Sequence, residues 1–393
     1  MKEGWEVKKL GEVCEVLNGF AFKSDKYVED GVRVIRITNV QHGYIEDNDP
    51  KFYPIDECER LKQYMLKEQD LLMSLTGNVG RVGLLDNKFL PAALNQRVAC
   101  LRIKDKSVEL KYLFHHLNSE LFETRCIQSA KGIAQKNMST EWLKEYSIPI
   151  PPLPEQSRIV EELDLLSNII EKKRQQLSEL DNLAQSIFYD MFGDPMTNEK
   201  GWEVKPLKDN VYEMFLGPFG SALKVDSYVE KENAYCMVYE QKHAIQGTLD
   251  ILTHYINKDK YDSLKRFAVK PGDFIMSCRG TIGKLYQLPI DAPLGIIHPS
   301  LMKIRIKDNI YHSLYFKYML VKIVANESTN GNCVQMAITA KELGNRRLPL
   351  PPLSLQQLFA QKIEAIEKQK ALIKQSIAET EELFNSRMDY YFS

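Results

Sequence analysis

The chain repeats itself at an interval of about 200 residues, and this repeat constrains the fold more than any other feature. Three motifs return in the same order at offsets between 197 and 203: segments 4–8, 70–81 and 149–153 correspond to 201–205, 273–284 and 349–353. Solenoid repeats are shorter, at about 20–50 residues. We therefore expect two copies of one architecture, each with a globular part of ~150 residues and a helical tail of ~40.

Each globular part has the pattern of a mixed α/β domain. Short apolar runs between Gly, Asn and Pro turns predict strands at Val32–Thr38, Asp70–Ser74, Val98–Ile103, Asp273–Ser277 and Leu301–Ile306. Helices are expected at Glu109–Cys126 and Tyr311–Ala325. The predicted organisation is an α/β domain over 1–152, a helical region over 153–200, a second α/β domain over 201–352 and a C-terminal helical region over 353–393.

The two tails carry the spacing of a coiled coil. Apolar residues follow one another at intervals of three and four, which is typical of helices that pack along one stripe. The first seam is Ile159, Leu163, Leu166, Ile170, Lys173, Leu177, Leu180, Ala184, Ile187 and Met191, and adding 200 gives Phe359, Ile363, Ile366, Lys370, Ile373, Ile377, Thr380, Phe384, Arg387 and Tyr391. Ser354 is expected to cap the second helix, and Gly193-Asp-Pro195 to end the first.

A long helix with one apolar stripe has to bury that stripe, so we expect the two tails to pack on each other in antiparallel directions. The first helix would carry the chain from one globular part to the other, and the second would return it. The molecule would then have pseudo-twofold symmetry, with Ser393 near Met1. In the alternative, each tail packs on its own globular part or on another chain.

Composition excludes several classes of protein. Hydrophobic residues make up 44% of the chain, but no apolar run approaches the ~20 residues of a transmembrane helix. The N-terminus lacks the apolar core of a signal peptide. Seven cysteines are scattered without a CxxC pair, which favours reduced thiols in a cytoplasmic protein. The net charge is −1, yet residues 201–353 carry 20 basic and 15 acidic side chains, a local excess that suits phosphate contacts.

We find no catalytic pattern in the chain. Residues 279–284 approach a phosphate-binding P-loop, but Cys278 stands where the first Gly is required and Leu285 follows the lysine. Both Pro-Pro pairs have Leu after them, whereas an adenine methyltransferase needs Tyr or Phe there. HExxH, GxGxxG, GxSxG and helicase motifs are absent, and the seven histidines lack metal-ligand spacing. We therefore expect no metal and no cofactor.

Polar residues at the turns are the candidates for nucleic-acid contacts, because Asn and Gln pair with adenine edges and Arg pairs with guanine. They are Lys23, Ser24, Arg36, Asn39, Thr76, Asn78, Arg81, Asn95, Gln96, Arg97, Gln135 and Lys136 in the first copy, and Arg279, Thr281, Lys284, His298, Ser300, Asn332 and Gln335 in the second. The alternatives are plain ones: a tight glycine turn after a strand, polar residues at strand entry, and surface connections.

In their order along the chain, these features resemble the specificity (S) subunits of Type I restriction–modification enzymes. The resemblance spans the whole chain. It is carried by the doubled Gly-Trp-x-x-x-x-Leu start, the Asp-x-x-x-Ser and Gly-x-x-Gly turn, the polar loops ending at Gln135 and Gln335, the Pro-Pro-Leu entry to each tail, and the Gly-Asp-Pro at Gly193.

The resemblance implies a non-catalytic subunit whose two globular parts are target recognition domains, each reading half of a bipartite site in double-stranded DNA. It also implies that the helices set the spacing and dock methyltransferase (modification) subunits, expected to number two, through which motor/nuclease (restriction) subunits join. Tyr239-Glu-Gln in the second copy replaces Arg36-Ile-Thr-Asn39 in the first, so we expect an asymmetric target. The alternatives are a single-chain restriction and methylation enzyme, or a coiled-coil scaffold without a DNA role.

Overall fold

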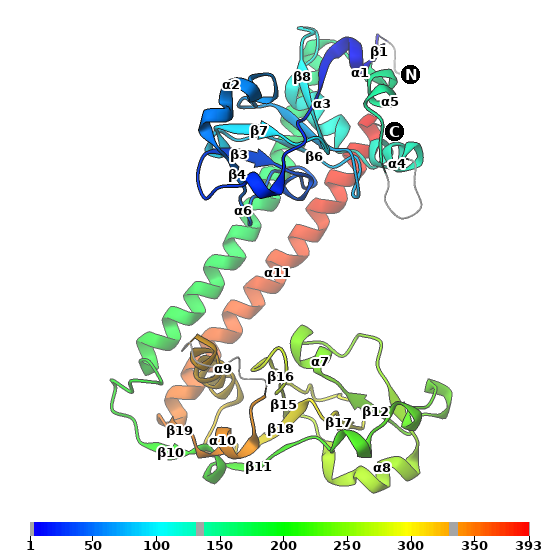
Figure 1. The fold of residues 1–393 in the computed structure, drawn as a ribbon. Helices are drawn as coiled ribbons and strands as arrows, with labels where there is room; N and C mark the ends of the chain where they lie inside the picture. The colour runs from blue at the N-terminus through cyan, green and yellow to red at the C-terminus, as the bar shows by residue number, and fades with distance from the viewer. Residues whose placement is uncertain (1–3, 131–136, 330–336, 393) are drawn as a thin grey trace. The chain divides into compact units, whose positions relative to one another are not determined.

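The computed structural model describes residues 4–130, 137–329 and 337–392. The chain forms two compact units, Met1–Gln175 with Ile373–Ser393, and Gln176–Leu372. Each unit therefore contains one globular part of the repeat and one half of each long helix (Figure 1). Within the described ranges, no helix is long and apolar enough to cross a membrane.

The globular part of the first unit is built on two small sheets. The antiparallel sheet has the order β2 (Cys14–Asn18), β8 (Val98–Ile103), β5 (Leu71–Ser74) and β6 (Val82–Leu84). The other has the order β4 (Phe52–Tyr53), β3 (Val32–Ile35) and β7 (Ala92–Leu94), with β3 and β7 parallel. Strand β5 is buried at every position, which explains why its first three residues are a continuous apolar run.

Short helices cover these sheets, and one of them corrects the sequence prediction. They are α1 (Leu10–Val13), α2 (Cys58–Leu61), α3 (Leu110–Leu117), α4 (Glu120–Ser129) and α5 (Thr140–Glu145). The single helix expected at Glu109–Cys126 is wrong, because it is divided into α3 and α4. The Ser119 hydroxyl accepts a hydrogen bond from the Phe122 amide at 3.3 Å and so starts a new helix.

The second unit repeats this plan, which confirms the predicted pair of mixed α/β domains. Its antiparallel sheet has the order β11 (Val211–Leu216), β18 (Leu301–Ile306), β15 (Phe274–Ser277) and β16 (Leu285–Gln287). Its other sheet has the order β13 (Tyr255–Ile256), β12 (Cys236–Tyr239), β17 (Gly295–Ile297) and β14 (Ala268–Val269). The helices are α7 (Gln241–Gln246), α8 (Lys258–Leu264), α9 (Ser313–Thr329) and α10 (Ala340–Asn345).

An ion pair explains one of the repeated sequence motifs. In the first unit, the Arg102 guanidinium donates two hydrogen bonds to Asp70, at 2.8 and 2.6 Å. Arg305 donates two to Asp273 in the second unit, both at 2.6 Å. Each aspartate is buried, and each pair joins the central strand of the antiparallel sheet to its neighbour. These residues hold the sheet together, so their recurrence reflects the fold.

The long helices α6 (Leu153–Phe192) and α11 (Leu353–Phe392) pack together within each unit. In the first unit, Ile159 and Leu163 of α6 share a core with Met388 and Tyr391 of α11. In the second unit, the C-terminal part of α6 meets the N-terminal part of α11. There, Ala184 and Phe188 of α6 share a core with residues 359–366 of α11. Every predicted seam residue is buried or half-buried. The seam prediction is therefore confirmed, whereas the pseudo-twofold relation of the copies stays a prediction.

Polar side chains fix the antiparallel register of the helix pair. In the first unit, the Lys173 ammonium donates to the Ser376 hydroxyl at 2.6 Å and to the Thr380 hydroxyl at 3.2 Å. In the second unit, Lys370 donates to Asp181 at 2.7 Å. The two lysines that interrupt the apolar seams thus reach across to the other helix, as expected of residues that set register. Ser354 lies inside α11, so the prediction that it caps this helix is wrong.

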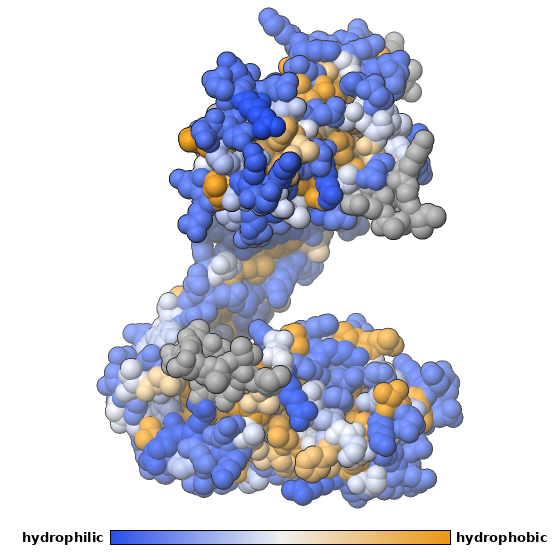
Figure 2. All heavy atoms as spheres, in the orientation of Figure 1, coloured by the Kyte–Doolittle hydropathy of each residue, from blue (hydrophilic) through white to orange (hydrophobic). Residues whose placement is uncertain are grey.

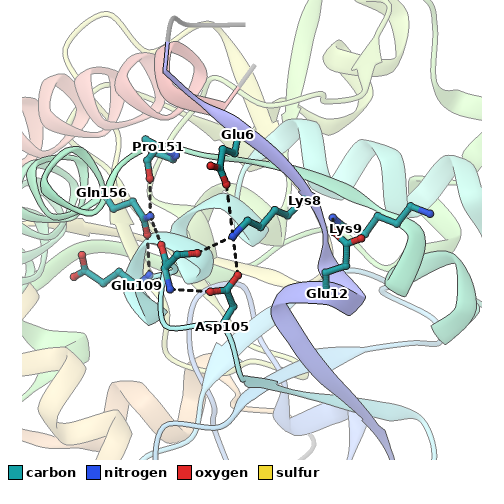
Figure 3. A network of polar contacts seen from close by, with 9 residues as sticks. Glu6, Lys8, Lys9, Glu12, Asp105, Glu109, Pro151 and Gln156 are labelled. Atoms are coloured by element: carbon teal, nitrogen blue, oxygen red, sulfur yellow. Dashed lines mark hydrogen bonds and ion pairs between the residues drawn. The ribbon is translucent and has the colours of Figure 1, made fainter.

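A buried glutamine attaches each long helix to its own globular part. Gln156 accepts a hydrogen bond from the Glu109 amide and donates to the carbonyls of Ser107 and Pro151, all at 2.8 Å (Figure 3). Gln356 makes the same three bonds in the second unit. Strand β1 (Glu6–Lys9) lies beside this network and pairs with β9 (Ser147–Ile150), as β10 (Val204–Pro206) pairs with β19 (Arg347–Pro349).

Candidate nucleic-acid interface

Sheet topology brings most of the candidate residues of the first unit to one edge. Strands β2 and β5 both end where β8 begins, since Asn18 pairs with Ala99 and Ser74 pairs with Val98. In the other sheet, the parallel strands β3 and β7 end side by side, with Ile35 opposite Leu94. The loops that follow these strands therefore meet. We call this surface the first loop face, defined as residues 19–24, 36–41, 75–81 and 95–97.

Hydrogen bonds join these loops into one surface. The Leu75 amide donates to the Arg97 carbonyl at 2.9 Å, and the Gln96 amide donates to the Phe20 carbonyl at 2.9 Å. The Arg81 guanidinium donates to the Gln41 side chain at 2.8 Å. Segments that are up to 76 residues apart in sequence are thus linked, and the position of each loop is determined by its neighbours.

In the second unit, the corresponding edge of the sheet carries an equivalent surface. We call it the second loop face, defined as residues 217–224, 240–242, 278–284 and 298–300. The Cys278 amide donates to the Ser300 carbonyl at 3.0 Å, and the His298 amide donates to the Tyr239 carbonyl at 2.8 Å. The Gln241 side chain donates to the Arg279 carbonyl at 2.6 Å. Both copies of the repeat therefore present loops from the same strand ends.

The Gly-x-x-Gly segment is a tight turn in both copies. The Ser277 hydroxyl closes it by accepting from the Lys284 amide at 2.9 Å and donating to the Thr281 carbonyl at 2.5 Å. Gly280 and Gly283 have φ angles of +63° and +82°, which favour glycine. At Gly283 a Cβ atom would also come within 2.5 Å of Val324. The glycines therefore form a tight turn after the strand, as one of the sequence interpretations proposed. This turn holds its polar residues on the second loop face.

The candidates differ in how far they reach solvent. The exposed ones are Lys23, Ser24, Asn78, Gln96, Arg97, Arg279, Thr281 and Lys284, and the half-buried ones are Arg36, Thr76, Arg81, Asn95 and His298. Asn39 and Ser300 are buried. Gln135, Lys136, Asn332 and Gln335 lie outside the described residues, so the predictions for them are unchanged.

Asn39 has a role inside the protein. Its side chain accepts from the Arg36 amide at 2.8 Å and donates to the Glu46 carbonyl and the Asp47 carboxylate, both at 2.9 Å. At the matching position of the second copy, the buried His243 ring accepts from the Glu240 amide at 2.8 Å. Both side chains cap the turn that follows the strand. We therefore remove Asn39 from the residues proposed to touch DNA.

Ser300 supports its neighbour His298. The His298 Nδ1 atom lies 2.8 Å from the Ser300 hydroxyl and accepts from the Ser300 amide at 3.2 Å. Burial lowers the pKa of His298, so the ring is neutral at pH 7 and keeps a donor on its other nitrogen. Ser300 thus orients the ring, and His298 remains the member of this pair able to meet a base.

The structure also identifies Glu240, which was not among the predicted contact residues. The capped turn places Glu240 where the first copy has Arg36, which reverses the charge at this position of the loop face. Glu240 accepts hydrogen bonds from Lys242 at 2.9 Å and from His254 at 3.0 Å. Arg36 instead donates to the Asp49 carbonyl at 2.5 Å. The offset of the repeated motif aligns Arg36 with Tyr239, whereas the capped turns align Arg36 with Glu240, one residue later.

The side chains of the loop faces are suited to hydrogen bonding, whereas the buried thiols are unreactive. No group of three or more His, Cys, Asp or Glu side chains in the described ranges is placed to hold a metal ion. Burial raises the pKa of the Cys14, Cys126 and Cys278 thiols to about 12, so these sulfurs are poor nucleophiles at neutral pH. Amide, guanidinium and imidazole groups on the loop faces are instead suited to hydrogen bonds with bases and phosphates.

The chain matches the model of a known protein family. Residues 2–182 and 199–382 match the family model of the Type I restriction modification DNA specificity domain. The chain belongs to this family, which confirms the resemblance predicted from the sequence. Its class of function is DNA sequence recognition in a type I restriction–modification system.

Two of the curated relatives come from Methanocaldococcus jannaschii. The chain is 26% identical over 390 residues to the putative type I restriction enzyme MjaX specificity subunit, covering 93% of this chain and 87% of the relative. It is 32% identical over 189 residues to the MjaVIII specificity subunit, covering 47% of this chain and 44% of the relative. This second alignment thus spans less than half of the relative's length.

Two solved structures show the same fold. One describes complex assembly and conformational transition of the type I R-M system, and it has a TM-score of 0.64 and 18% identity, covering 100% of this chain and 98% of that chain. The other is the type I restriction–modification S subunit from M. genitalium, with a TM-score of 0.52 and 13% identity, covering 98% and 95%.

Proposed function

We propose that the two loop faces read the two halves of a bipartite, asymmetric sequence in double-stranded DNA. One observation carries this proposal: the same sheet edge presents a cluster of polar loops in both copies, but with different side chains. Arg36, Asn95, Gln96 and Arg97 are among those of the first face, and Arg279, Thr281, Lys284 and His298 are among those of the second. A shared framework with unlike contact residues suits two unlike half-sites.

Charge supports the difference between the half-sites. Where the first loop face has Arg36, the second has Glu240. Arginine pairs with guanine, whereas a carboxylate accepts from cytosine. The excess of basic side chains over residues 201–353 supplies the phosphate contacts that any half-site needs.

The long helices would space the two recognition domains, 1–152 and 201–352, and dock the catalytic partners. Leu183 of α6 and Leu383 of α11 are about half exposed, and they occupy matching positions of the repeat. An exposed leucine that recurs at the matching position of both helices suits a repeated protein interface. Two matching sites suit two methyltransferase subunits, through which restriction subunits would join. The protein would work in the cytoplasm with these partners, without a cofactor of its own.

The test is to purify the full chain alone and with methyltransferase subunits. The chain alone should bind duplex DNA in a salt-dependent manner but neither methylate nor cleave it, and the complex should methylate one two-part motif in host DNA. Methyl transfer by the isolated chain at the rate of the complex would support a single-chain enzyme. Absence of salt-dependent DNA binding, alone and in the complex, would support the coiled-coil scaffold.

A further inference from the structure

An aromatic side chain stands free in water on the second loop face. Phe219 follows β11 in the segment Gly217-Pro-Phe-Gly220, and 88% of it is exposed. Apolar patches interrupt the mostly hydrophilic surface in Figure 2. However, a nearly fully exposed Phe is unusual, because burying its ring would be strongly favourable.

The backbone on both sides of Phe219 is held in place. The Gly217 amide donates to the Leu301 carbonyl at 2.9 Å, and Gly217 lies so close to His298 that a Cβ atom would be 2.2 Å from its carbonyl oxygen. After Phe219, the Ala222 amide donates back to the Phe219 carbonyl at 2.8 Å. The ring is thus presented by a loop anchored beside the turn that carries His298.

Basic side chains lie at the same sheet edge as the Phe219 loop. The Cys278 amide bonds to Ser300, which brings the turn with Arg279 and Lys284 to the same sheet edge as the Phe219 loop. Arg279, Lys284 and Lys224 are all exposed. Cations around an apolar side chain complement DNA, whose phosphates flank stacked bases.

In the described loop of the first copy that corresponds to the Phe219 loop, no aromatic ring projects in this way. In the corresponding loop, Phe20 and Phe22 are half-buried and contact each other, with ring centroids 5.2 Å apart. Phe20 also contacts Tyr64, and Phe22 contacts Tyr53. The aromatic residues of the first loop face therefore stabilise the protein, which leaves Phe219 as a feature of the second face.

We propose that Phe219 is a wedge that inserts between stacked base pairs in the half-site read by the second loop face. Apolar side chains inserted at a base step partly unstack it and kink the duplex. The wedge would make recognition in this half-site depend on how easily one step unstacks, in addition to its hydrogen bonds. This inference rests on the proposed function, because it assumes that the second loop face meets DNA.

The test places 2-aminopurine, whose fluorescence rises on unstacking, at successive positions of both half-sites once the target sequence is mapped. We compare the wild-type chain with Phe219→Ala, Phe219→Leu and the control Ile290→Ala, alone and in complex with methyltransferase subunits. Ile290 is 90% exposed but follows β16, at the opposite edge of the sheet. These side chains are exposed, so all variants should fold normally.

We expect fluorescence to rise at one step of the second half-site with the wild type, Phe219→Leu and Ile290→Ala. Phe219→Ala should lose this signal and bind roughly tenfold more weakly, and a mismatch at that step should restore its affinity. Base flipping by the methyltransferase subunits would persist in Phe219→Ala, so the variant separates the two sources of signal.

Wild-type fluorescence and affinity in Phe219→Ala would overturn the wedge while leaving the proposed function intact. The same holds if Phe219→Ala weakens binding only where the site contains a thymine methyl group, since the ring would then touch that methyl without unstacking. A wild-type complex that does not bind the second half-site would overturn both proposals.

Discussion

Replacing Gln156 by methionine should destabilise the first unit, because one side chain makes three buried hydrogen bonds that tie α6 to its globular part. The Gln156 side chain is completely buried, and all three bonds are 2.8 Å long. A buried hydrogen bond contributes about 1 kcal/mol net to the free energy of unfolding. Methionine has nearly the same length and volume, so the packing change is small. We therefore expect a loss of about 3 kcal/mol.

Thermal unfolding and hydrogen exchange measure this loss. For a unit of this size, about 3 kcal/mol corresponds to a decrease of roughly 6–12 °C in the melting temperature. The Glu109 amide should also exchange faster, since it donates to the Gln156 side chain in the wild type. Gln356→Met should produce the same changes in the second unit, where the His312 amide is the donor.

Gln156→Glu is the matched control for shape. It keeps an acceptor for the Glu109 amide but places a carboxylate oxygen opposite the carbonyls of Ser107 and Pro151. It should be less stable than Gln156→Met at pH 7 and recover partly in acid, where the carboxyl group gains a proton. If Gln156→Met melted with the wild type and the Glu109 amide stayed protected, the helix would not be held in this way.

Three further predictions concern other parts of the chain. Leu166→Asp should lower the melting temperature and prevent assembly with partners, because an unpaired carboxylate in the seam costs several kcal/mol; no change in either would contradict the seam. Burial lowers the pKa of His116 from 6.5 to about 4, so only the unfolded chain gains this proton as the pH first falls below 6.5. The stability present above pH 6.5 should decline by about 3 kcal/mol towards pH 4. His116→Met, which copies Met319 of the second unit, should remove this decline, and an unchanged pH profile would contradict it. Adding seven residues after Gln176 and at the facing point of α11 lengthens the pair by ~10 Å, or about three base pairs. Duplexes with varied spacers should then show a longer preferred spacer or loss of specific binding; an unchanged preference would mean that the helices do not set the spacing.

The sequence predicted those features that depend on local spacing. Seam residues such as Leu163 and Ile363 were identified because helical periodicity alone places them on one face. Turn glycines such as Gly283 were identified because a positive φ angle favours this residue. Both properties belong to short segments of the chain.

What could not be predicted depends on partners that are distant in sequence. Gln156 resembles a surface residue until the Ser107 and Glu109 backbone lies beside it. Phe188 lies one position away from the seam, and it is buried because it also stacks on Tyr315 of α9. Similarly, the buried side-chain amide of Asn39 donates a hydrogen bond to Asp47, so it is not free to contact a base. The sequence alone did not reveal this partner.

The two loop faces should act as separate readers, and exchanging one of them tests this directly. Residues 206–349 are replaced by the equivalent segment of a relative with a different target, and the complex with methyltransferase subunits is expressed in a host whose methylated sites are then sequenced. We predict that one half of the two-part motif changes to that of the relative and the other half stays as in the wild type. A change in both halves, or an unchanged motif, would contradict the assignment of one half-site to each loop face.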